Sequence, residues 1–292
     1  MLIKVHNLTK SYGDTVALRA LNFSIKEGTV CGIIGPNGSG KTTFLSILTG
    51  LLNATNGGIT IESNKTMGAL IEGPSFYNHL TVRQNLQLIG HLRNVANPDT
   101  SVVLDLVNLS EQADKKYERL SLGMKQRLGI AGTLVGNSDI IVLDEPTNGV
   151  DSLGITEIRE IIIQLQNINK TVIIASHLLT EIEQICSDLI ILHNGNLVFD
   201  GSPRELMKTQ KSMIEVAAKD NGKLLAIFKD YAGIIAIHHK SGMLLLEVSD
   251  YISTNDINML CTSNGIILSS LSVAEPKLEN AFLNLIKSSK NE

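Results

Sequence analysis

A glycine-rich stretch near the start of the chain has the spacing of a phosphate-binding loop. Residues 35–43 read GPNGSGKTT, which matches G-x-x-x-x-G-K-[ST]. The glycines let backbone N–H groups converge on phosphate oxygens, and the start of a following helix adds its positive dipole end. Lys41 is expected to reach the β- and γ-phosphates, and the Thr42 hydroxyl to bind Mg²⁺. The residues assigned to this site are Gly35, Asn37, Gly38, Ser39, Gly40, Lys41, Thr42 and Thr43.

Two carboxylates and a histidine follow two further apolar runs. Asp144 and Glu145 come directly after IIVL, and His177 comes directly after TVIIAS. A phosphate loop needs a carboxylate at the tip of a neighbouring strand to hold Mg²⁺, and Asp144 suits that role. Glu145 would then lie beside the γ-phosphate, where it can orient or deprotonate the attacking water, and His177 would contact the same phosphate. The alternatives are an ordinary Glu-Pro-Thr turn and a structural histidine, and the upstream phosphate loop argues against both.

The elements that must position these residues alternate between strand and helix. An apolar run at 29–34 leads into the loop, and residues 44–52 follow it with apolar side chains at helical spacing. A chance glycine-rich turn, the alternative for this motif, does not explain that order. Strands alternating with helices predict a mainly parallel α/β sheet. The other predicted elements are strands at 2–8, 17–25, 139–144 and 171–176, a helix at 155–166, and a hairpin at 188–201 with its turn at Asn194-Gly195.

The middle and the end of the chain differ from this pattern. Residues 76–135 are predicted to be helical, and Thr81 and Gln84 fit a capping box that opens one helix. After about residue 210 the sequence predicts a small α+β appendage. We therefore predict an α/β domain with the phosphate loop at 1–210, in which the helical zone forms a subdomain, and an accessory domain at 211–292. The helices expected in these zones are 85–93, 100–109 and 278–286, and the strands are 213–218, 233–239, 243–249 and 265–273.

Composition bounds the remaining possibilities. The 292 residues are 43% hydrophobic with a net charge of −4, which gives no argument for nucleic-acid binding. Three distant cysteines without a CxxC pair favour a reducing compartment and buried, apolar roles. The first residues have no long apolar segment typical of a signal peptide, and no run approaches the roughly 18 apolar residues that cross a bilayer. A role at a membrane would require a partner.

One further motif makes the whole set resemble a known family. Residues 120–127 read LSLGMKQR, which is similar to the LSGGQ signature of the nucleotide-binding subunits of ABC transporters. Leu122 and Met124 depart from that signature, whereas Ser121 and Gly123 keep it. Other P-loop enzymes, such as small GTPases and kinases, lack this element. A chance helix N-cap explains the serine but not its place between the phosphate loop and Asp144.

The resemblance implies how ATP is bound. Ser121 and Gly123 would close over the ATP that is held by the phosphate loop of a second subunit, either a second copy of this chain or a different ABC subunit. Asn148-Gly-Val-Asp151 matches the family's D-loop, which lies between the two ATP molecules. Tyr12 matches the aromatic residue that stacks on adenine, and the alternative is a tyrosine that merely flanks a strand.

Glu72 stands where the family has the glutamine of its Q-loop. The replacement, in the context ALIEGPSFY, is similar to the E-loop of ABC ATPases that protect bacteria from bacitracin and lantibiotics. Glu72 could bind Mg²⁺, but with Asp144 and Glu145 nearby it also adds like-charge repulsion. The alternative is that Glu72 is an ordinary solvated loop residue. Phe76, Tyr77 and His79 would either contact a membrane subunit or pack within the helical zone.

The resemblance implies an ATPase subunit with Mg²⁺ and ATP that powers a separate integral membrane permease from the cytoplasmic face of the membrane. The expected cargo is a lantibiotic or a bacitracin-like peptide. An exporter of another substrate, such as a drug, lipid or polysaccharide, is the alternative. A soluble ABC protein that acts on ribosomes or DNA is disfavoured, because the chain has one ABC unit and no long coiled coil between phosphate loop and signature.

Overall fold

The computed structural model describes residues 1–95, 98–229, 231–240, 242–249 and 251–288. The chain divides into two compact units, Met1–Pro203 and Arg204–Lys287, and each is described by itself. The division falls a few residues before the predicted boundary at 210.

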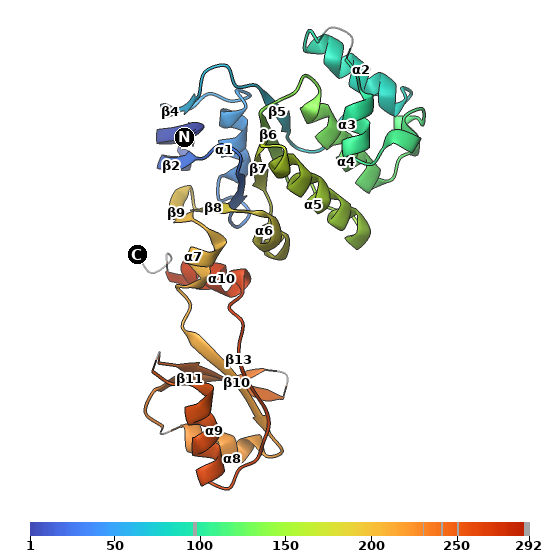
Figure 1. Cartoon of the computed structure of the whole chain (residues 1–292). Coiled ribbons are helices and arrows are strands. Elements are labelled where there is room, and N and C mark those ends of the chain that lie inside the picture. The colour runs from blue at the N-terminus through green and yellow to red at the C-terminus, as the bar shows by residue number, and fades with distance from the viewer. Residues whose placement is uncertain (96–97, 230, 241, 250, 289–292) are drawn as a thin grey trace. The chain divides into compact units, whose positions relative to one another are not determined.

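A six-stranded sheet forms the centre of the larger unit (Figure 1). Its strand order is β5-β6-β7-β3-β8-β9, and all pairs are parallel except β8 with β9. Each residue of β3, β6 and β7 is buried, as expected for parallel strands covered on both faces. The hairpin turn at Asn194-Gly195 has both residues at positive φ, as predicted. The strands are β3 (Val30–Ile34), β5 (Met67–Leu70), β6 (Ile140–Asp144), β7 (Thr171–Ala175), β8 (Asp188–His193) and β9 (Asn196–Gly201).

A helix and a second sheet cover one face of this sheet. The antiparallel sheet β2-β1-β4 contains β1 (Ile3–Tyr12), β2 (Thr15–Ile25) and β4 (Asn56–Ile61). Helix α1 (Lys41–Leu48) places Phe44 and Leu45 in one hydrophobic core with residues of both sheets. The predicted helix to residue 52 is too long: α1 ends at Leu48, because Gly50 adopts a φ of 76° that stops the helical backbone.

Two helices cover the opposite face. Along β7 the side chains alternate, so that Ile173 joins the core around α1 whereas Ile174 contacts α5 (Ser152–Asn167) and α6 (Leu179–Ile185). Helix α5 buries Ile158, Ile161, Ile162 and Leu165 on one side, as its apolar spacing predicts. The polar residues that follow β3, β6 and β7 therefore lie at one edge of a rigid, fully covered sheet.

The helical zone lies between β5, a strand that was not predicted, and β6. Thr81 and Gln84 form the expected capping box, and Leu134 ends the signature helix. The predicted helix at 100–109 is shorter in the structure, because Asn108 has a φ of 54° and turns the chain. The elements are α2 (Val82–Leu92), α3 (Ser101–Leu106), two 3₁₀ turns at Ser110–Gln112 and Tyr117–Arg119, and α4 (Leu122–Leu134).

The smaller unit is an α+β sandwich. Four antiparallel strands in the order β11-β12-β10-β13 alternate with helices as β-α-β-β-α-β, the ferredoxin-like arrangement. The four predicted strands are confirmed, but α8 and α9 were not predicted. Helix α9 buries only Ile257 and Cys261, so its sequence carries little helical signal. The elements are α7 (Pro203–Met207), β10 (Ser212–Ala218), α8 (Asn221–Phe228), β11 (Ile234–Lys240), β12 (Met243–Val248), α9 (Thr254–Ser263), β13 (Leu268–Val273) and α10 (Leu278–Ser288).

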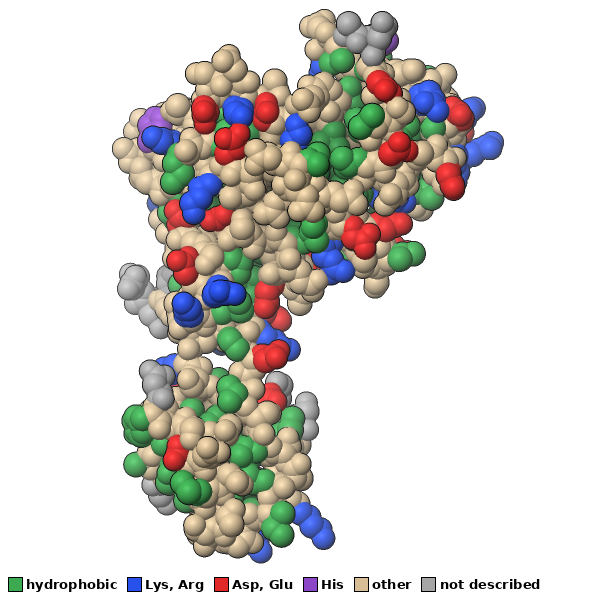
Figure 2. Space-filling view, viewed as in Figure 1, with side chains coloured by type: hydrophobic (Ala, Val, Ile, Leu, Met, Phe, Trp, Pro, Cys, Tyr) green, Lys and Arg blue, Asp and Glu red, His purple; other side chains and the backbone are tan. Residues whose placement is uncertain are grey.

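The surface and the cysteines fit the composition. On the face shown in Figure 2, acidic and basic side chains are interspersed over the larger unit. Cys31, Cys186 and Cys261 are all free thiols in buried positions, as predicted. Within the described ranges, no helix is long and apolar enough to cross a membrane.

Candidate nucleotide-binding site

The phosphate loop runs between the end of β3 and the start of α1, as its motif predicts. At two glycines of the loop, neighbouring backbone atoms leave no room for a side chain. A Cβ on Gly35 would lie 2.2 Å from the Leu192 carbonyl oxygen, and one on Gly40 would lie 2.8 Å from that of Ala17. Gly40 also has a φ of 107°, which L-residues with side chains rarely adopt. The neighbouring backbone therefore forces glycine at both ends of the loop.

Lys41 begins α1 and folds back over the loop. Its Nζ donates to the carbonyl oxygens of Gly35 at 2.8 Å and Pro36 at 3.3 Å. Burial lowers the pKa of Lys41, while the carboxylates of Glu145 and Asp144 oppose this shift. The ammonium group is thus held by the strand-end carbonyls and faces the acidic edge of the site. Asn37 and Gly38 are exposed at the tip of the loop, and Ser39 Oγ is buried beneath it.

Thr42 and Asp144 are brought together from different elements. Burial raises the pKa of Asp144, and the nearby Thr42 hydroxyl opposes this shift by favouring the carboxylate. Asp144 Oδ1 is buried and accepts no hydrogen bond from any described residue. An anionic oxygen in this state calls for a cation, and Mg²⁺ binds through one or two protein oxygens together with substrate phosphates. The pair therefore fits the predicted Mg²⁺ ligands.

Glu145 and His177 form the closest contact at this edge. His177 Nδ1 lies 2.7 Å from Glu145 Oε2. Strands β6 and β7 are neighbours, which places the residues that follow them side by side. Glu145 N–H donates to the Ala175 carbonyl oxygen at 2.9 Å and has a φ of 49°, so its backbone is held in the left-handed region. Such a conformation in a non-glycine residue costs free energy and is concentrated at functional sites.

Glu72 is exposed on the loop that follows β5, and it also has a left-handed backbone with a φ of 60°. Its charge is one of the weaker causes that raise the pKa of Asp144, so the two carboxylates are electrostatically coupled. They do not form a metal site of their own: in the described part of the chain, no three His, Cys, Asp or Glu side chains could hold a metal ion. The structure thus places the charge of Glu72 within electrostatic reach of Asp144.

Ser121 and Asp151 each cap a helix near the other. Ser121 Oγ accepts from Met124 N–H at 3.3 Å, and Asp151 Oδ1 accepts from Gly154 N–H at 3.0 Å. The two helix starts are in contact, because a Cβ on Gly123 would lie 3.8 Å from Gly154 Cα. The signature and the D-loop therefore form one surface.

Leu122, which differs from the family signature, lies on the same surface. Its side chain is 46% exposed, and its Cδ2 would lie 3.2 Å from a Cβ on Gly149 in the D-loop. Leucine at this position thus packs over a glycine that has no side chain of its own. Sequence reasoning noted the substitution but had no signal for its partner.

The aromatic predictions fall into different environments. Tyr12 is exposed, and the Lys10 ammonium lies 5.1 Å from its ring centroid. Phe76 packs on the Tyr117 ring at 5.4 Å between centroids, which favours internal packing for Phe76. Tyr77 and His79 are exposed and contact each other edge to face. The surface of this loop therefore carries Tyr77 and His79.

Sequence reasoning missed two residues that hold the loop after Glu72. Buried Asn85 accepts from Tyr77 N–H at 2.9 Å and donates to the Tyr77 and Thr81 carbonyl oxygens. Tyr117 OH donates to the Pro74 carbonyl oxygen at 2.9 Å. The signal for Asn85 was a polar residue on the apolar side of the α2 pattern.

Comparison with known proteins agrees with this site. Residues 18–148 match the family model described as ABC transporter. The bacitracin transport ATP-binding protein BcrA of Bacillus licheniformis is 35% identical, over 98% of this chain and 97% of that protein. The lantibiotic transport ATP-binding protein SrtF of Streptococcus pyogenes is 37% identical, over 69% of this chain and 93% of that protein. A dimeric post-hydrolysis structure of the ATP-binding cassette MJ0796, bound to ADP and Pi, has a TM-score of 0.61 at 27% identity and covers 69% of this chain and 98% of that one. The chain belongs to the ABC transporter family, as an ATP-binding subunit that hydrolyses ATP.

Proposed function

We propose that this chain works at the cytoplasmic face of the cell membrane and powers a separate integral membrane permease that expels a bacitracin-like or lantibiotic peptide. The observation that carries the ATPase assignment is the Glu145–His177 contact of 2.7 Å beside the Thr42–Asp144 pair. The cargo assignment rests on the names of the relatives BcrA and SrtF.

The site residues have distinct roles in this proposal. The loop backbone and Lys41 bind the β- and γ-phosphates, and Tyr12 stacks on adenine. Thr42 and Asp144 hold Mg²⁺, which neutralises charge on the phosphate oxygens when it is bound. Glu145 takes the proton of the attacking water, and His177 holds the Glu145 carboxylate in place while it contacts the γ-phosphate.

The proposal includes a dimer in which two chains share two ATP molecules. Ser121 is exposed at the start of α4, where its hydroxyl and the first N–H groups of a 13-residue helix can receive a phosphate. The phosphate loop lies at the start of α1, a different helix of the same unit, so a second chain is expected to supply the signature to each ATP. The MJ0796 dimer supports this arrangement. Asp151 and the D-loop would lie between the two sites.

The loop after Glu72 is the proposed contact with the permease. Tyr77 and His79 are its exposed aromatic side chains, and Asn85 and Tyr117 fix its backbone. A change at Glu72 would therefore reach the exposed face of the loop.

We assign residues 1–210 to the ATPase domain and residues 211–292 to the accessory domain. The alignment with BcrA covers 98% of this chain, so it includes most of the smaller unit. The alignment with SrtF covers 69% of this chain, so it cannot include both units in full. Both a bacitracin-like peptide and a lantibiotic are therefore tested as cargo.

The test is drug susceptibility in a sensitive bacterium that carries this gene with its operon neighbours. The panel holds bacitracin, several lantibiotics and unrelated drugs, and Glu145→Gln is the matched inactive control. Resistance to a peptide antibiotic that is lost in the control is the expected result. No peptide resistance, with an active ATPase and the permease present, would overturn the cargo assignment.

A further inference from the structure

Helix α5 carries two charged side chains that reach different neighbouring helices. Glu157 Oε2 lies 3.4 Å from the Nε of Arg127 on the signature helix α4. Two residues further along, Arg159 Nη1 lies 3.6 Å from Glu181 Oε2 on α6. One helix is thus ion-paired to both the helix that begins after Ser121 and the helix that begins after His177.

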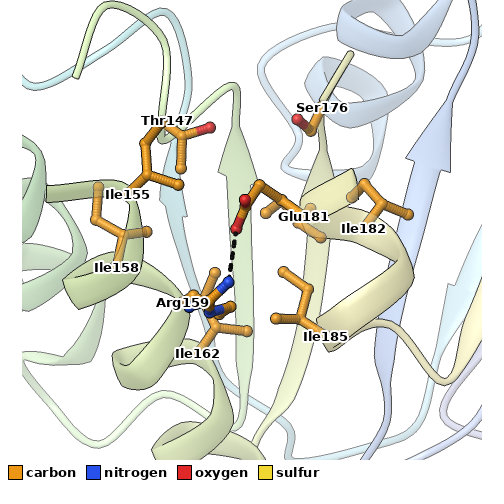
Figure 3. Close-up of a pocket in the computed structure, with 10 residues that line it drawn as sticks. Thr147, Ile155, Ile158, Arg159, Ile162, Ser176, Glu181, Ile182 and Ile185 are labelled. Carbon is orange, nitrogen blue, oxygen red and sulfur yellow. Dashed lines mark ion pairs between the residues drawn. The ribbon is translucent and has the colours of Figure 1, made fainter. Parts of the chain in front are cut away.

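Arg159 and Glu181 both line a small pocket between α5 and α6 (Figure 3). Arg159 also donates to the Gln184 side-chain oxygen, so it contacts both Glu181 and Gln184, which lie one turn apart on α6. The Arg159 and Glu181 side chains are only 25% and 20% exposed. Isoleucines of α5 and α6 form most of the wall, and Thr147 and Ser176 complete it next to the catalytic edge.

Helix α6 depends on these contacts for its position. It has seven residues and no side-chain hydrogen bond at its N-cap, and helices this short are not stable alone. Its apolar contacts to α5 are packed isoleucines, which have no directional preference. The Arg159–Gln184 hydrogen bond is directional, and the Arg159–Glu181 ion pair adds a charge attraction at 3.6 Å, so together they fix how far α6 extends along α5.

The position of α6 decides where His177 lies. Only Leu178 separates His177 from the first residue of α6, and Leu178 N–H donates to Ser176 Oγ at 3.0 Å. A shift or rotation of α6 would therefore move the His177 ring relative to Glu145. The ion pair and hydrogen bond of Arg159 are with Glu181 and Gln184 of α6 rather than with Glu145 or the phosphate loop, so any effect of the pair on catalysis passes through α6.

We propose that Arg159 and Glu181 are positioning residues that hold His177 against Glu145 by locking α6 to α5. The proposal rests on the proposed function of Glu145 and His177. It has a second consequence, because α5 is also tied to α4 through Arg127. Arg127 is 6% exposed and donates to the Val107 and Asn108 carbonyl oxygens, so it is firmly held. Movement of α6 is thereby passed to Ser121, which serves the other ATP in the dimer.

The test compares charge reversals in the purified full-length chain. Arg159→Glu and Glu181→Arg are measured singly and together for kcat, KM and the Hill coefficient of ATP hydrolysis. Each single reversal is expected to lower kcat by about three- to tenfold with little change in KM and to lower the Hill coefficient, and the double reversal to restore both. In a His177→Ala background, Arg159→Glu is expected to cause no further loss of kcat.

The matched control is Lys65→Glu, which reverses one charge of the Lys65–Glu27 pair. Glu27 precedes β3 and Lys65 precedes β5, so both lie at the edge of the six-stranded sheet opposite the phosphate loop. The kcat of this variant should therefore not change. Wild-type turnover and its loss in Glu145→Gln test the proposed function separately. Hydrogen exchange of residues 179–185, which needs no turnover, should be faster in each single reversal and normal in the double. Unchanged kcat and exchange in the single reversals, or equal losses with and without His177, would overturn the proposal.

Discussion

Glu145 and His177 face each other at 2.7 Å from the ends of two neighbouring parallel strands, β6 and β7. Glu145 is held at its backbone and at its side chain: its N–H donates to the Ala175 carbonyl oxygen of β7, and His177 contacts its carboxylate. Because the strands are buried along their whole length, they fix the backbone positions from which both side chains extend, and α6 sets the place of the His177 ring.

Asp144→Asn should stabilise the nucleotide-free chain while abolishing Mg²⁺-dependent hydrolysis. Burial raises the pKa of Asp144 in the folded state, so folding favours the protonated form. The carboxyl therefore costs no stability below its unfolded pKa of about 4 and becomes destabilising as the pH rises through the raised folded value. Thermal unfolding of both chains between pH 4 and pH 8 measures this.

The Asp144→Asn variant should have the higher Tm at pH 7.5, and the difference should shrink toward pH 4. A Tm difference that does not depend on pH would contradict the assigned cause of the pKa shift.

Glu72→Gln should change the amount of peptide exported for each ATP hydrolysed. The structure places Glu72 on the loop that carries the exposed Tyr77 and His79. ATP hydrolysis should therefore continue while coupling to the permease changes. Peptide efflux and ATPase rate in proteoliposomes with the permease give the ratio. An identical ratio in both chains would remove any special role for this carboxylate.

Gly154→Ala should be more destabilising than Gly123→Ala, although alanine normally favours helices over glycine by about 1 kcal/mol. A Cβ on Gly154 would lie 2.5 Å from Val150 Cγ1 and 2.9 Å from Asp151 Oδ1, the D-loop cap. At Gly123 the nearest atom is 3.4 Å away, an ordinary contact. Overpacking of this kind costs about 1–3 kcal/mol.

Chemical denaturation of the two glycine variants side by side provides the measurement. Equal midpoints would show that the signature and D-loop helices adapt to the added methyl group at Gly154.

Much of the larger unit could be predicted because its signals are local. The phosphate-loop glycines, the Thr81 capping box and the Asn194-Gly195 turn each specify a backbone conformation within a few residues. Continuous apolar runs likewise identified β3, β6 and β7 as buried strands. In the smaller unit, α8 and α9 were missed because their buried faces contain few residues and their polar caps resemble loops.

The relations across the site are not local and could not be predicted from the residues alone. Strand order places β7 between β3 and β6, and nothing in the three apolar runs states that order. The left-handed backbones of Glu72 and Glu145 have no sequence signal, since glutamate rarely adopts them. The contact of Gly123 with Gly154 joins residues whose motifs are separate along the chain.

ATP-dependent dimerisation and turnover of the Glu145→Gln chain test the central claim most directly. Sedimentation with Mg²⁺-ATP gives the mass of the complex, and the ATPase rate of the same sample gives turnover. The account predicts a loss of at least about 100-fold in kcat, ATP that remains bound, and a stable particle of twice the mass of one chain. Undiminished turnover would contradict the role of Glu145 as the base, and an ATP-bound monomer would contradict the shared site.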